Sequence, residues 1–184
     1  MNVMLSGHTN RAVFVDRDGT LAPDVNYCLR PDDFILFSEV PDAIRMLNDA
    51  GFKVIVITNQ SGIARGYFTE ETLTNIHQKL KDELGKNGAH IDAIYYCPHH
   101  PDDKCQCRKP GTLLFKRAAE DMEVDLSQSF VIGDRDVDMK AGKAVGAKTI
   151  LVTTGPDKDT SLAEYPDYVA SDLLEAIRWI GVES

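Results

Sequence analysis

Four short runs of mainly apolar residues recur along the chain, and polar or amphipathic segments separate each run from the next. The runs lie at residues 12–15, 53–57, 130–132 and 149–152. Unbroken apolar runs, as opposed to alternating ones, are typical of strands buried on both faces of a parallel sheet. The pattern therefore predicts that these four segments form the interior of one sheet.

Helical spacing of apolar residues marks the segments between these runs. Two residues indicate where helices begin. Pro41 suits a first helical position, and Thr69 can cap a helix that ends near Leu84. Glycines mark two stops, at Gly51 and Gly146. The five predicted helices cover residues 41–50, 70–84, 112–122, 137–145 and 173–180.

Strands that alternate with helices indicate an α/β fold, here a Rossmann-like three-layer arrangement with a mainly parallel central sheet. The segments after the first two runs are too short to form a large cap domain, and no linker divides the chain. We therefore expect residues 1–184 to form a single domain, with a polar surface loop at residues 155–166. In such a sheet, ligands bind beyond the carboxyl ends of the strands.

The charge balance and the apolar content narrow the range of partners. The chain has 184 residues, with 20 basic against 29 acidic side chains and a net charge of −9, which disfavours non-specific binding to nucleic acid and suits metal ions. No apolar run approaches the roughly 18–20 residues that span a bilayer, and residues 1–11 lack the apolar core of a signal peptide. We expect a cytoplasmic, monomeric protein that binds neither nucleic acid nor membranes.

Two aspartates directly follow the first apolar run, in the motif Asp16-Arg17-Asp18-Gly19-Thr20. Carboxylates two residues apart at a strand end can share a divalent cation, and one can attack an electrophile while the other exchanges protons. A solvated acidic turn is the alternative for a bare pair of aspartates. The glycine, which permits a sharp turn, and the buried strand before the motif favour a catalytic site.

Three further polar motifs follow along the chain. Residues 58–62 carry a hydroxyl and backbone amides that can hold phosphate oxygens after the second run. Lys109 can neutralise a phosphoryl group during its transfer. The acidic segment 134–138 can complete the octahedral oxygen site that magnesium prefers. Taken singly, a capping threonine, a surface lysine and an acidic helix start are the alternatives.

Three of the four cysteines lie within eleven residues, at Cys97, Cys105 and Cys107. With His99 or His100 they supply three thiolates and one imidazole, which fill a tetrahedral zinc site and leave no open position, as in structural sites. Such a metal would fold a loop that has too few apolar residues to fold by itself. Reduced, unligated cysteines are the alternative.

Together and in this order, the four motifs resemble those of the haloacid dehalogenase superfamily of aspartyl phosphotransferases. The resemblance covers roughly residues 11–155. It implies that Asp16 is the nucleophile that accepts the phosphoryl group and that Asp18 is the general acid and base. A covalent intermediate of this kind splits one difficult step into two easier ones.

The resemblance also assigns the residues around the transferred group. It implies that Thr58 and Lys109 stabilise the phosphoryl oxygens. Asp134 would bind magnesium together with Asp16 and the backbone carbonyl of Asp18. The cation suppresses the repulsion between an anionic nucleophile and phosphate. By the same resemblance, Asp138 orients the lysine or a metal-bound water.

The cysteine loop within this scaffold narrows the resemblance to one branch, the D,D-heptose 1,7-bisphosphate phosphatases and the histidinol-phosphate phosphatases. Both groups carry Cys-x-His and Cys-x-Cys pairs that end in Arg-Lys-Pro, and residues 58–69 and 95–101 look like the heptose enzymes. The implied zinc ligands are Cys97, His99, Cys105 and Cys107. The implied substrate contacts are Asp24, Val25, Asn26, Tyr27, Asn59, Gln60, Ser61 and Arg108.

The activity that this branch implies is hydrolysis of the 7-phosphate of a small-molecule sugar bisphosphate, D-glycero-D-manno-heptose 1,7-bisphosphate. That step belongs to nucleotide-activated heptose synthesis for surface glycans such as lipopolysaccharide. The implied cofactors are a catalytic Mg²⁺ and a structural Zn²⁺. A histidinol-phosphate phosphatase, which shares the catalytic residues, is the alternative. A non-catalytic zinc-binding module is a third hypothesis, and the four ordered motifs disfavour it.

Overall fold

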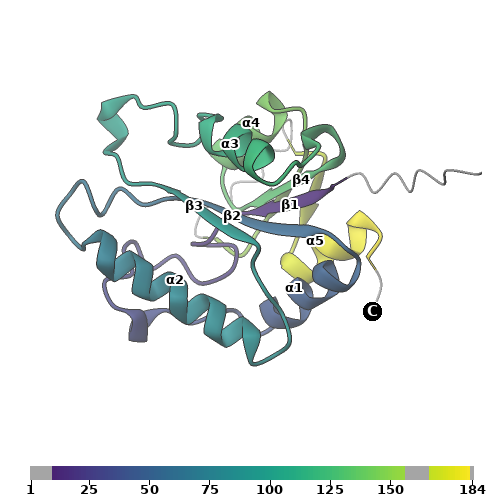
Figure 1. Cartoon of the computed structure of the whole chain (residues 1–184), viewed down its shortest axis with the longest axis horizontal. Helices are drawn as coiled ribbons and strands as arrows, with labels where there is room; N and C mark the ends of the chain where they lie inside the picture. Colours follow the sequence, from purple (N-terminus) through teal and green to yellow (C-terminus); the bar gives the residue numbers. More distant parts are fainter. Residues whose placement is uncertain (1–9, 156–165, 183–184) are drawn as a thin grey trace, which may run out of the picture.

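A six-stranded parallel sheet forms the centre of the computed structural model, which describes residues 10–155 and 166–182 (Figure 1). The strand order within this part of the chain is β3-β2-β1-β4-β5-β6, and every neighbouring pair is parallel. The strands are β1 (Ala12–Val15), β2 (Lys53–Asn59), β3 (Ala93–Cys97), β4 (Phe130–Gly133), β5 (Lys148–Val152) and β6 (Tyr168–Ala170). This sheet confirms the predicted Rossmann-like α/β fold.

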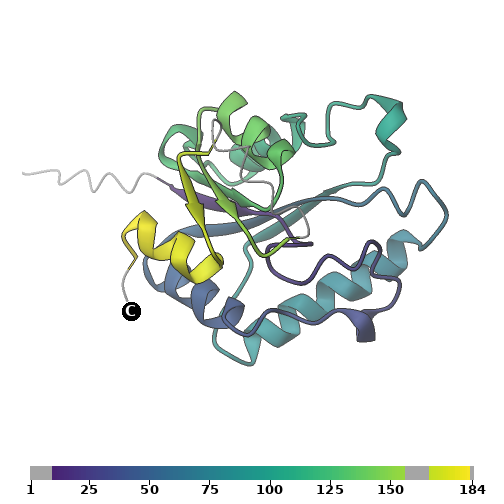
Figure 2. The ribbon, with the colours of Figure 1, turned by 180° about the vertical axis from the view of Figure 1, so that it is seen from behind.

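Helices cover both faces of the sheet and complete three layers (Figures 1 and 2). One face carries α3 (Leu113–Asp121) and α4 (Asp136–Ala144). The other carries α1 (Val40–Asp49), α2 (Glu70–Gly85) and α5 (Leu173–Ile180). Short 3-10 helices lie in the connections, at η1 (Pro31–Asp33), η2 (Pro101–Asp103) and η3 (Leu126–Gln128).

The two faces of the sheet bury separate apolar clusters. Phe14 of β1 packs against Phe115 of α3 with ring centroids 5.3 Å apart. Its neighbour Val13 belongs to the cluster on the opposite face, together with Ile44 of α1 and Leu80 of α2. Consecutive residues of β1 thus point into different cores, which explains why the whole run is apolar.

The apolar pattern predicted the four inner strands and missed the two edge strands, β3 and β6. A strand at the edge of a sheet is less covered, and the first four residues of β3 and the first two of β6 are only half-buried. Edge strands therefore do not need an unbroken apolar run. The five predicted helices are all present, and each end lies within one residue of the expected position.

Side chains at the helix ends account for several of these boundaries. The hydroxyl of Thr69 accepts a hydrogen bond of 3.1 Å from the backbone N–H of Thr72 and caps α2, as predicted. The carboxylate of Asp172 caps α5 in the same way, at 2.8 Å from the backbone nitrogen of Glu175. No helix in the described ranges is both long and apolar enough to cross a membrane.

The carboxyl ends of β1, β2, β3 and β4 share one edge of the sheet, since these strands are parallel neighbours. Segment 16–37 follows β1, the η2 loop follows β3, and α4 begins just after β4 (Figure 1). The predicted motifs therefore meet at this edge. Residues 156–165, which hold most of the expected polar loop, and residues 1–9, on which the signal-peptide argument rests, lie outside the described part of the chain.

Candidate active site

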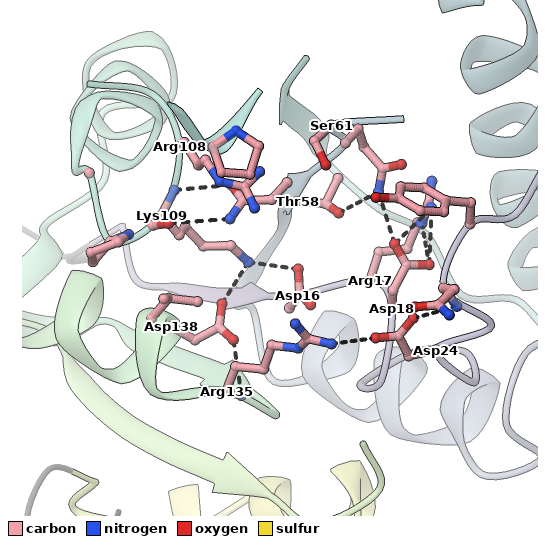
Figure 3. Close-up of a pocket in the computed structure, with 18 of the residues that line it drawn as sticks. Asp16, Arg17, Asp18, Asp24, Thr58, Ser61, Arg108, Lys109, Arg135 and Asp138 are labelled. Atoms are coloured by element: carbon pink, nitrogen blue, oxygen red, sulfur yellow. Dashed lines mark hydrogen bonds and ion pairs between the residues drawn. The ribbon is translucent and has the colours of Figure 1, made fainter. Parts of the chain in front are cut away.

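A buried lysine joins two carboxylates at the end of β1. The ammonium of Lys109 lies 2.6 Å from Oδ1 of Asp16, 2.6 Å from Oδ1 of Asp138 and 2.7 Å from the carbonyl oxygen of Ile57 (Figure 3). Lys109 is only 4% exposed. Burial by itself lowers the pKa of Lys109, but Asp138 and Asp16 outweigh it and hold this pKa above its ordinary value. The lysine therefore stays charged and aims its ammonium at Asp16.

Asp16, the predicted nucleophile, directly follows β1 and lies against the ammonium of Lys109. Burial raises the pKa of its carboxyl, the ammonium of Lys109 opposes this effect and the negative charge of Asp138 adds to it, with a net pKa of about 7. The carboxylate lines a cavity of about 690 Å³ at the carboxyl edge of the sheet. A cation beside Asp16 would favour the ionised, nucleophilic form of this carboxyl.

Asn59, the last residue of β2, anchors the backbone of Lys109. Its side-chain oxygen accepts a hydrogen bond of 3.0 Å from the backbone N–H of Lys109, and its amide nitrogen donates one of 3.3 Å to the carbonyl of the same residue. Asn59 was predicted as a substrate contact. It lines the cavity as expected, but the structure uses both ends of its amide to hold the lysine in place.

Asp134 presents a carboxylate that is buried and has no hydrogen-bond partner among the described residues. Its exposed fraction is 0%, neither oxygen accepts a hydrogen bond, and the guanidinium of Arg135 lies 3.8 Å from Oδ2. Burial raises its pKa to about 8, and the charges of Asp16 and Asp138 add to that shift. A buried carboxylate without a donor is costly, and a bound cation removes that cost. The three carboxylates offer oxygens within 4.8 Å of one another, which fits a magnesium ion.

Two glycines make room for this carboxylate. A methyl group at Gly19 or at Gly155 would overlap the side chain of Asp134. Gly19 also has a φ of +85°, a backbone conformation that glycine adopts without strain. The glycine of the first motif therefore serves both the turn after β1 and the close approach of the predicted metal ligand.

Asp18 points its carboxylate at two donors. The guanidinium of Arg17 contacts both of its oxygens, at 2.8 Å and 3.0 Å from Nη2 (Figure 3). The amide nitrogen of Gln60 donates to Oδ2 of Asp18 at 2.9 Å and to the hydroxyl oxygen of Thr58 at 2.8 Å. Gln60, predicted to bind substrate, therefore links the predicted general acid and base to the predicted phosphoryl-binding hydroxyl.

The predicted substrate contacts all line one cavity, which also contains Asp16, Asp18, Thr58 and Lys109. They come from three segments, residues 24–27, residues 59–61 and Arg108. Asp24 does not stand free, since its Oδ2 lies 2.6 Å from the guanidinium of Arg135 at the start of α4 (Figure 3). This ion pair connects the segment after β1 with the fourth motif across the cavity.

The cysteine cluster forms one compact group between β3 and Arg108. The Sγ atoms of Cys97, Cys105 and Cys107 lie 3.0–3.5 Å apart, and Nδ1 of His99 lies 3.1 Å from Sγ of Cys107. A tetrahedral zinc site with Zn–S bonds near 2.3 Å places its sulfurs about 3.8 Å apart, so this group fits zinc with small adjustments. His100 instead caps η2, because its Nδ1 accepts from the backbone N–H of Asp102.

Two arginines that were not predicted as site residues form ion pairs with residues that were. Arg17 holds Asp18, and Arg135 holds Asp24. The sequence contains one usable signal for the first, namely that Arg17 separates the two aspartates of the motif and directly follows a buried strand. Nothing in the sequence connects Arg135 with Asp24, because 111 positions separate them.

Known proteins share this architecture. A family model described as HAD-hydrolase-like matches residues 106–176. The crystal structure of D,D-heptose 1,7-bisphosphate phosphatase from B. bronchiseptica, complexed with magnesium and phosphate, matches with a TM-score of 0.87 and 36% identity, covering 95% of this chain and 99% of that one. The fold and the site thus define a hydrolase of the haloacid dehalogenase class.

Similar sequences identify the family within this class. A D-glycero-beta-D-manno-heptose-1,7-bisphosphate 7-phosphatase from Haemophilus ducreyi is 38% identical over 92% of this chain and 98% of its own length. A probable D-glycero-D-manno-heptose-1,7-bisphosphate 7-phosphatase from Thermoplasma volcanium is 47% identical over 68% of this chain and 86% of its own length. The chain belongs to the D-glycero-D-manno-heptose-1,7-bisphosphate 7-phosphatase family. The chain is therefore an enzyme, and the hypothesis of a non-catalytic zinc-binding module is wrong.

Proposed function

We propose that this enzyme hydrolyses the 7-phosphate of D-glycero-D-manno-heptose 1,7-bisphosphate and releases inorganic phosphate and the sugar 1-phosphate. One observation carries the proposal. The carboxylate of Asp16 lies at the end of β1, against the ammonium of Lys109 and beside the carboxylate of Asp134, which accepts no hydrogen bond from the described residues. This set supplies a nucleophile, a fixed positive charge and a metal ligand for phosphoryl transfer.

The first half of the reaction transfers the phosphoryl group to the enzyme. An oxygen of Asp16 attacks phosphorus, the bond between phosphorus and the sugar oxygen breaks, and the sugar oxygen takes the proton of Asp18. In the second half, water attacks the phosphoryl group, Asp18 takes a proton from that water, and the bond to Asp16 breaks. Lys109 neutralises charge on the phosphoryl oxygens in both halves, because its ammonium is held beside Asp16.

Magnesium would be held by Asp16, by Asp134 and by the backbone carbonyl of Asp18. When bound, the ion neutralises charge on the nucleophile and on the phosphoryl oxygens. The buried oxygens of Asp134, which accept no hydrogen bond from the described residues, support this assignment. Asp138 is assigned to Lys109 in place of the metal, because its Oδ1 contacts the ammonium and its Oδ2 accepts from the backbone N–H of Arg135.

The far end of the cavity would hold the part of the substrate that is not cleaved. Residues 24–27 and Ser61 line the cavity, and the η2 loop contributes Lys104 to it. Nη1 of Arg108 is buried and has no hydrogen-bond partner among the described residues. A free guanidinium nitrogen suits a phosphate or a sugar hydroxyl, so Arg108 is assigned to the 1-phosphate end of the substrate.

A substrate comparison tests the proposed activity. Phosphate release should be measured at steady state, in magnesium, from the β anomer and the α anomer of the heptose 1,7-bisphosphate and from histidinol phosphate. We expect kcat/KM to favour one of the heptose anomers over histidinol phosphate by at least about 100-fold, since the distal contacts are built for a second anionic group. A preference for histidinol phosphate would overturn the substrate assignment and retain the catalytic residues.

Zinc in the cysteine cluster is the second metal that we propose. Its loss should destabilise the η2 loop more than the central sheet. We expect about one zinc per chain in the purified protein and none after Cys107→Ser, with the free energy of unfolding lowered by at least about 2 kcal/mol. KM should rise several-fold because the η2 loop borders the cavity. Elemental analysis, thermal unfolding and steady-state kinetics measure these three effects.

Cys28→Ser is the matched control for this experiment. Cys28 is buried and contributes nothing to the cluster, since its thiol donates to the carbonyl of Arg30 at 3.3 Å. The control variant should retain its zinc, so it separates the loss of a thiol from the loss of the metal. Wild-type protein without zinc, with all thiols open to titration, would refute the site.

The remaining assignments follow from these. We propose that the chain works as one domain, in which residues 97–107 form the zinc loop inserted before Arg108. We further propose a cytoplasmic monomer that acts on its small-molecule substrate without nucleic acid or membrane partners. The net charge of −9 supports the exclusion of nucleic acid.

A further inference from the structure

The guanidinium of Arg17 is buried between Asp18 and the helix layer. Arg17 is 1% exposed. Its Nη2 contacts both oxygens of Asp18, and its Nε lies 3.1 Å from Oδ1 of the same carboxylate. The ring of Phe34 lies 5.6 Å from the guanidinium carbon. A forked guanidinium fixes the plane of the carboxylate that it holds, so the direction of Asp18 depends on the direction of Arg17.

A histidine from a distant helix contacts the remaining nitrogen of this guanidinium. Nε2 of His77, on α2, lies 3.3 Å from Nη1 of Arg17. His77 is 9% exposed and lies on the buried stripe of α2 that otherwise carries Leu73, Ile76, Leu80 and Leu84. An apolar side chain is expected at such a position. The imidazole of His77 is polar, and its hydrogen-bond partner is Arg17.

The chemistry of the two side chains sets the direction of this hydrogen bond. Burial, chiefly, and the positive charge of Arg17 together lower the pKa of His77 to about 3. The imidazole is therefore neutral at working pH and offers one nitrogen lone pair. Arg17 is a guanidinium, which is always charged and can only donate. Nη1 of Arg17 thus donates to Nε2 of His77.

We propose that His77 is a positioning residue, which holds the guanidinium of Arg17 and thereby directs the carboxylate of Asp18 for proton transfer. This inference rests on the function proposed above for Asp18. Asp18 has a second contact, from Gln60, which belongs to the phosphoryl-binding motif. His77 instead connects the general acid and base to the middle of α2, so that a helix outside the four motifs takes part in setting its orientation.

The leaving group distinguishes positioning from general support. The leaving group of phenyl phosphate is phenolate, which is a poor leaving group and needs the proton of Asp18 as its bond to phosphorus breaks. With 4-nitrophenyl phosphate, the nitrophenolate leaves as a stable anion and needs no proton. If the carboxylate of Asp18 loses its orientation, phosphorylation of the enzyme should therefore slow much more with phenyl phosphate than with 4-nitrophenyl phosphate.

The test compares His77→Phe with His77→Gln in single-turnover phosphorylation, with magnesium present. His77→Phe removes the acceptor, and we expect about a 30-fold loss with phenyl phosphate against no more than about threefold with 4-nitrophenyl phosphate. His77→Gln restores an acceptor oxygen and should recover most of the lost rate. KM for both substrates should stay near the wild-type value, because His77 does not line the cavity.

Leu80→Ala is the matched control, since Leu80 lies on the same buried stripe and does not contact Arg17. It should lower the thermal midpoint and change the rates with the two substrates by equal factors. Equal losses with both substrates in His77→Phe, or a failure of His77→Gln to recover the rate, would overturn the proposal. A wild-type enzyme that releases phosphate from no substrate would overturn the proposed function itself, and this inference with it.

Discussion

Replacing Asp16 by asparagine is expected to abolish phosphate release and leave the fold intact. Asparagine has the shape of aspartate but cannot form the acyl phosphate, so kcat should fall by at least about 10³-fold. The stability should not suffer. Lys109 retains Asp138 and the carbonyl of Ile57 as partners, and the substitution removes one of three carboxylates that repel one another in a buried site.

The measurement combines steady-state phosphate release with mass spectrometry of acid-quenched enzyme. Wild-type enzyme quenched during turnover should carry one phosphoryl group, and Asp16→Asn should carry none. Asp42→Asn is the control, because Asp42 lies on the exposed side of α1, pairs with Arg45 and does not line the cavity that contains Asp16. If Asp16→Asn retained substantial turnover, the nucleophile would have to be another group.

Replacing Lys109 by methionine is expected to damage both catalysis and stability. The ammonium has three acceptors within 2.7 Å, and methionine leaves two buried carboxylates and one carbonyl without their donor. Removing one partner of a buried ion pair costs about 3–5 kcal/mol. The loss of a positive charge from the phosphoryl group should lower kcat by about 10²–10³-fold.

Magnesium should restore part of the lost stability in this variant. A cation held by Asp16 and Asp134 would offset some of the repulsion between the carboxylates that the ammonium no longer neutralises. Chemical denaturation with and without magnesium, together with steady-state kinetics, measures both effects. Lys53→Met is the control, since Lys53 is a half-exposed lysine of β2 whose partner is Asp92. An unfolding free energy of Lys109→Met equal to that of the wild type would contradict the buried contacts described for this lysine.

The sequence allowed the layered fold and the convergence of the four motifs at one cavity to be predicted, because both depend on local patterns. Buried strands need apolar residues on both faces, so β1, β2, β4 and β5 were visible as runs. Their carboxyl ends must meet at one edge, so Asp16, Thr58 and Asp134 were expected to converge. The edge strands β3 and β6 escaped, because partial exposure relaxes the demand for apolar residues.

The partners of individual side chains could not be predicted in the same way. Asn59 and Gln60 follow a strand and carry amides, which suits contact with substrate. The structure shows that these amides bind Lys109, Asp18 and Thr58. Which acceptor an amide finds depends on the packing of segments that are 42 and 50 positions apart in the chain. No pattern within either segment contains that information.

The double hydrogen bond between Asn59 and the backbone of Lys109 has an evolutionary consequence. It ties the lysine to the last residue of a central strand, so the position of the ammonium does not depend only on the segment that leads to it. The stretch 100–104, between the proposed zinc ligands His99 and Cys105, is therefore free to gain or lose residues, or to change its sequence, while the lysine keeps its place. Variation in the length of this segment offers a route to new substrate preferences that leaves the chemistry of the site unchanged.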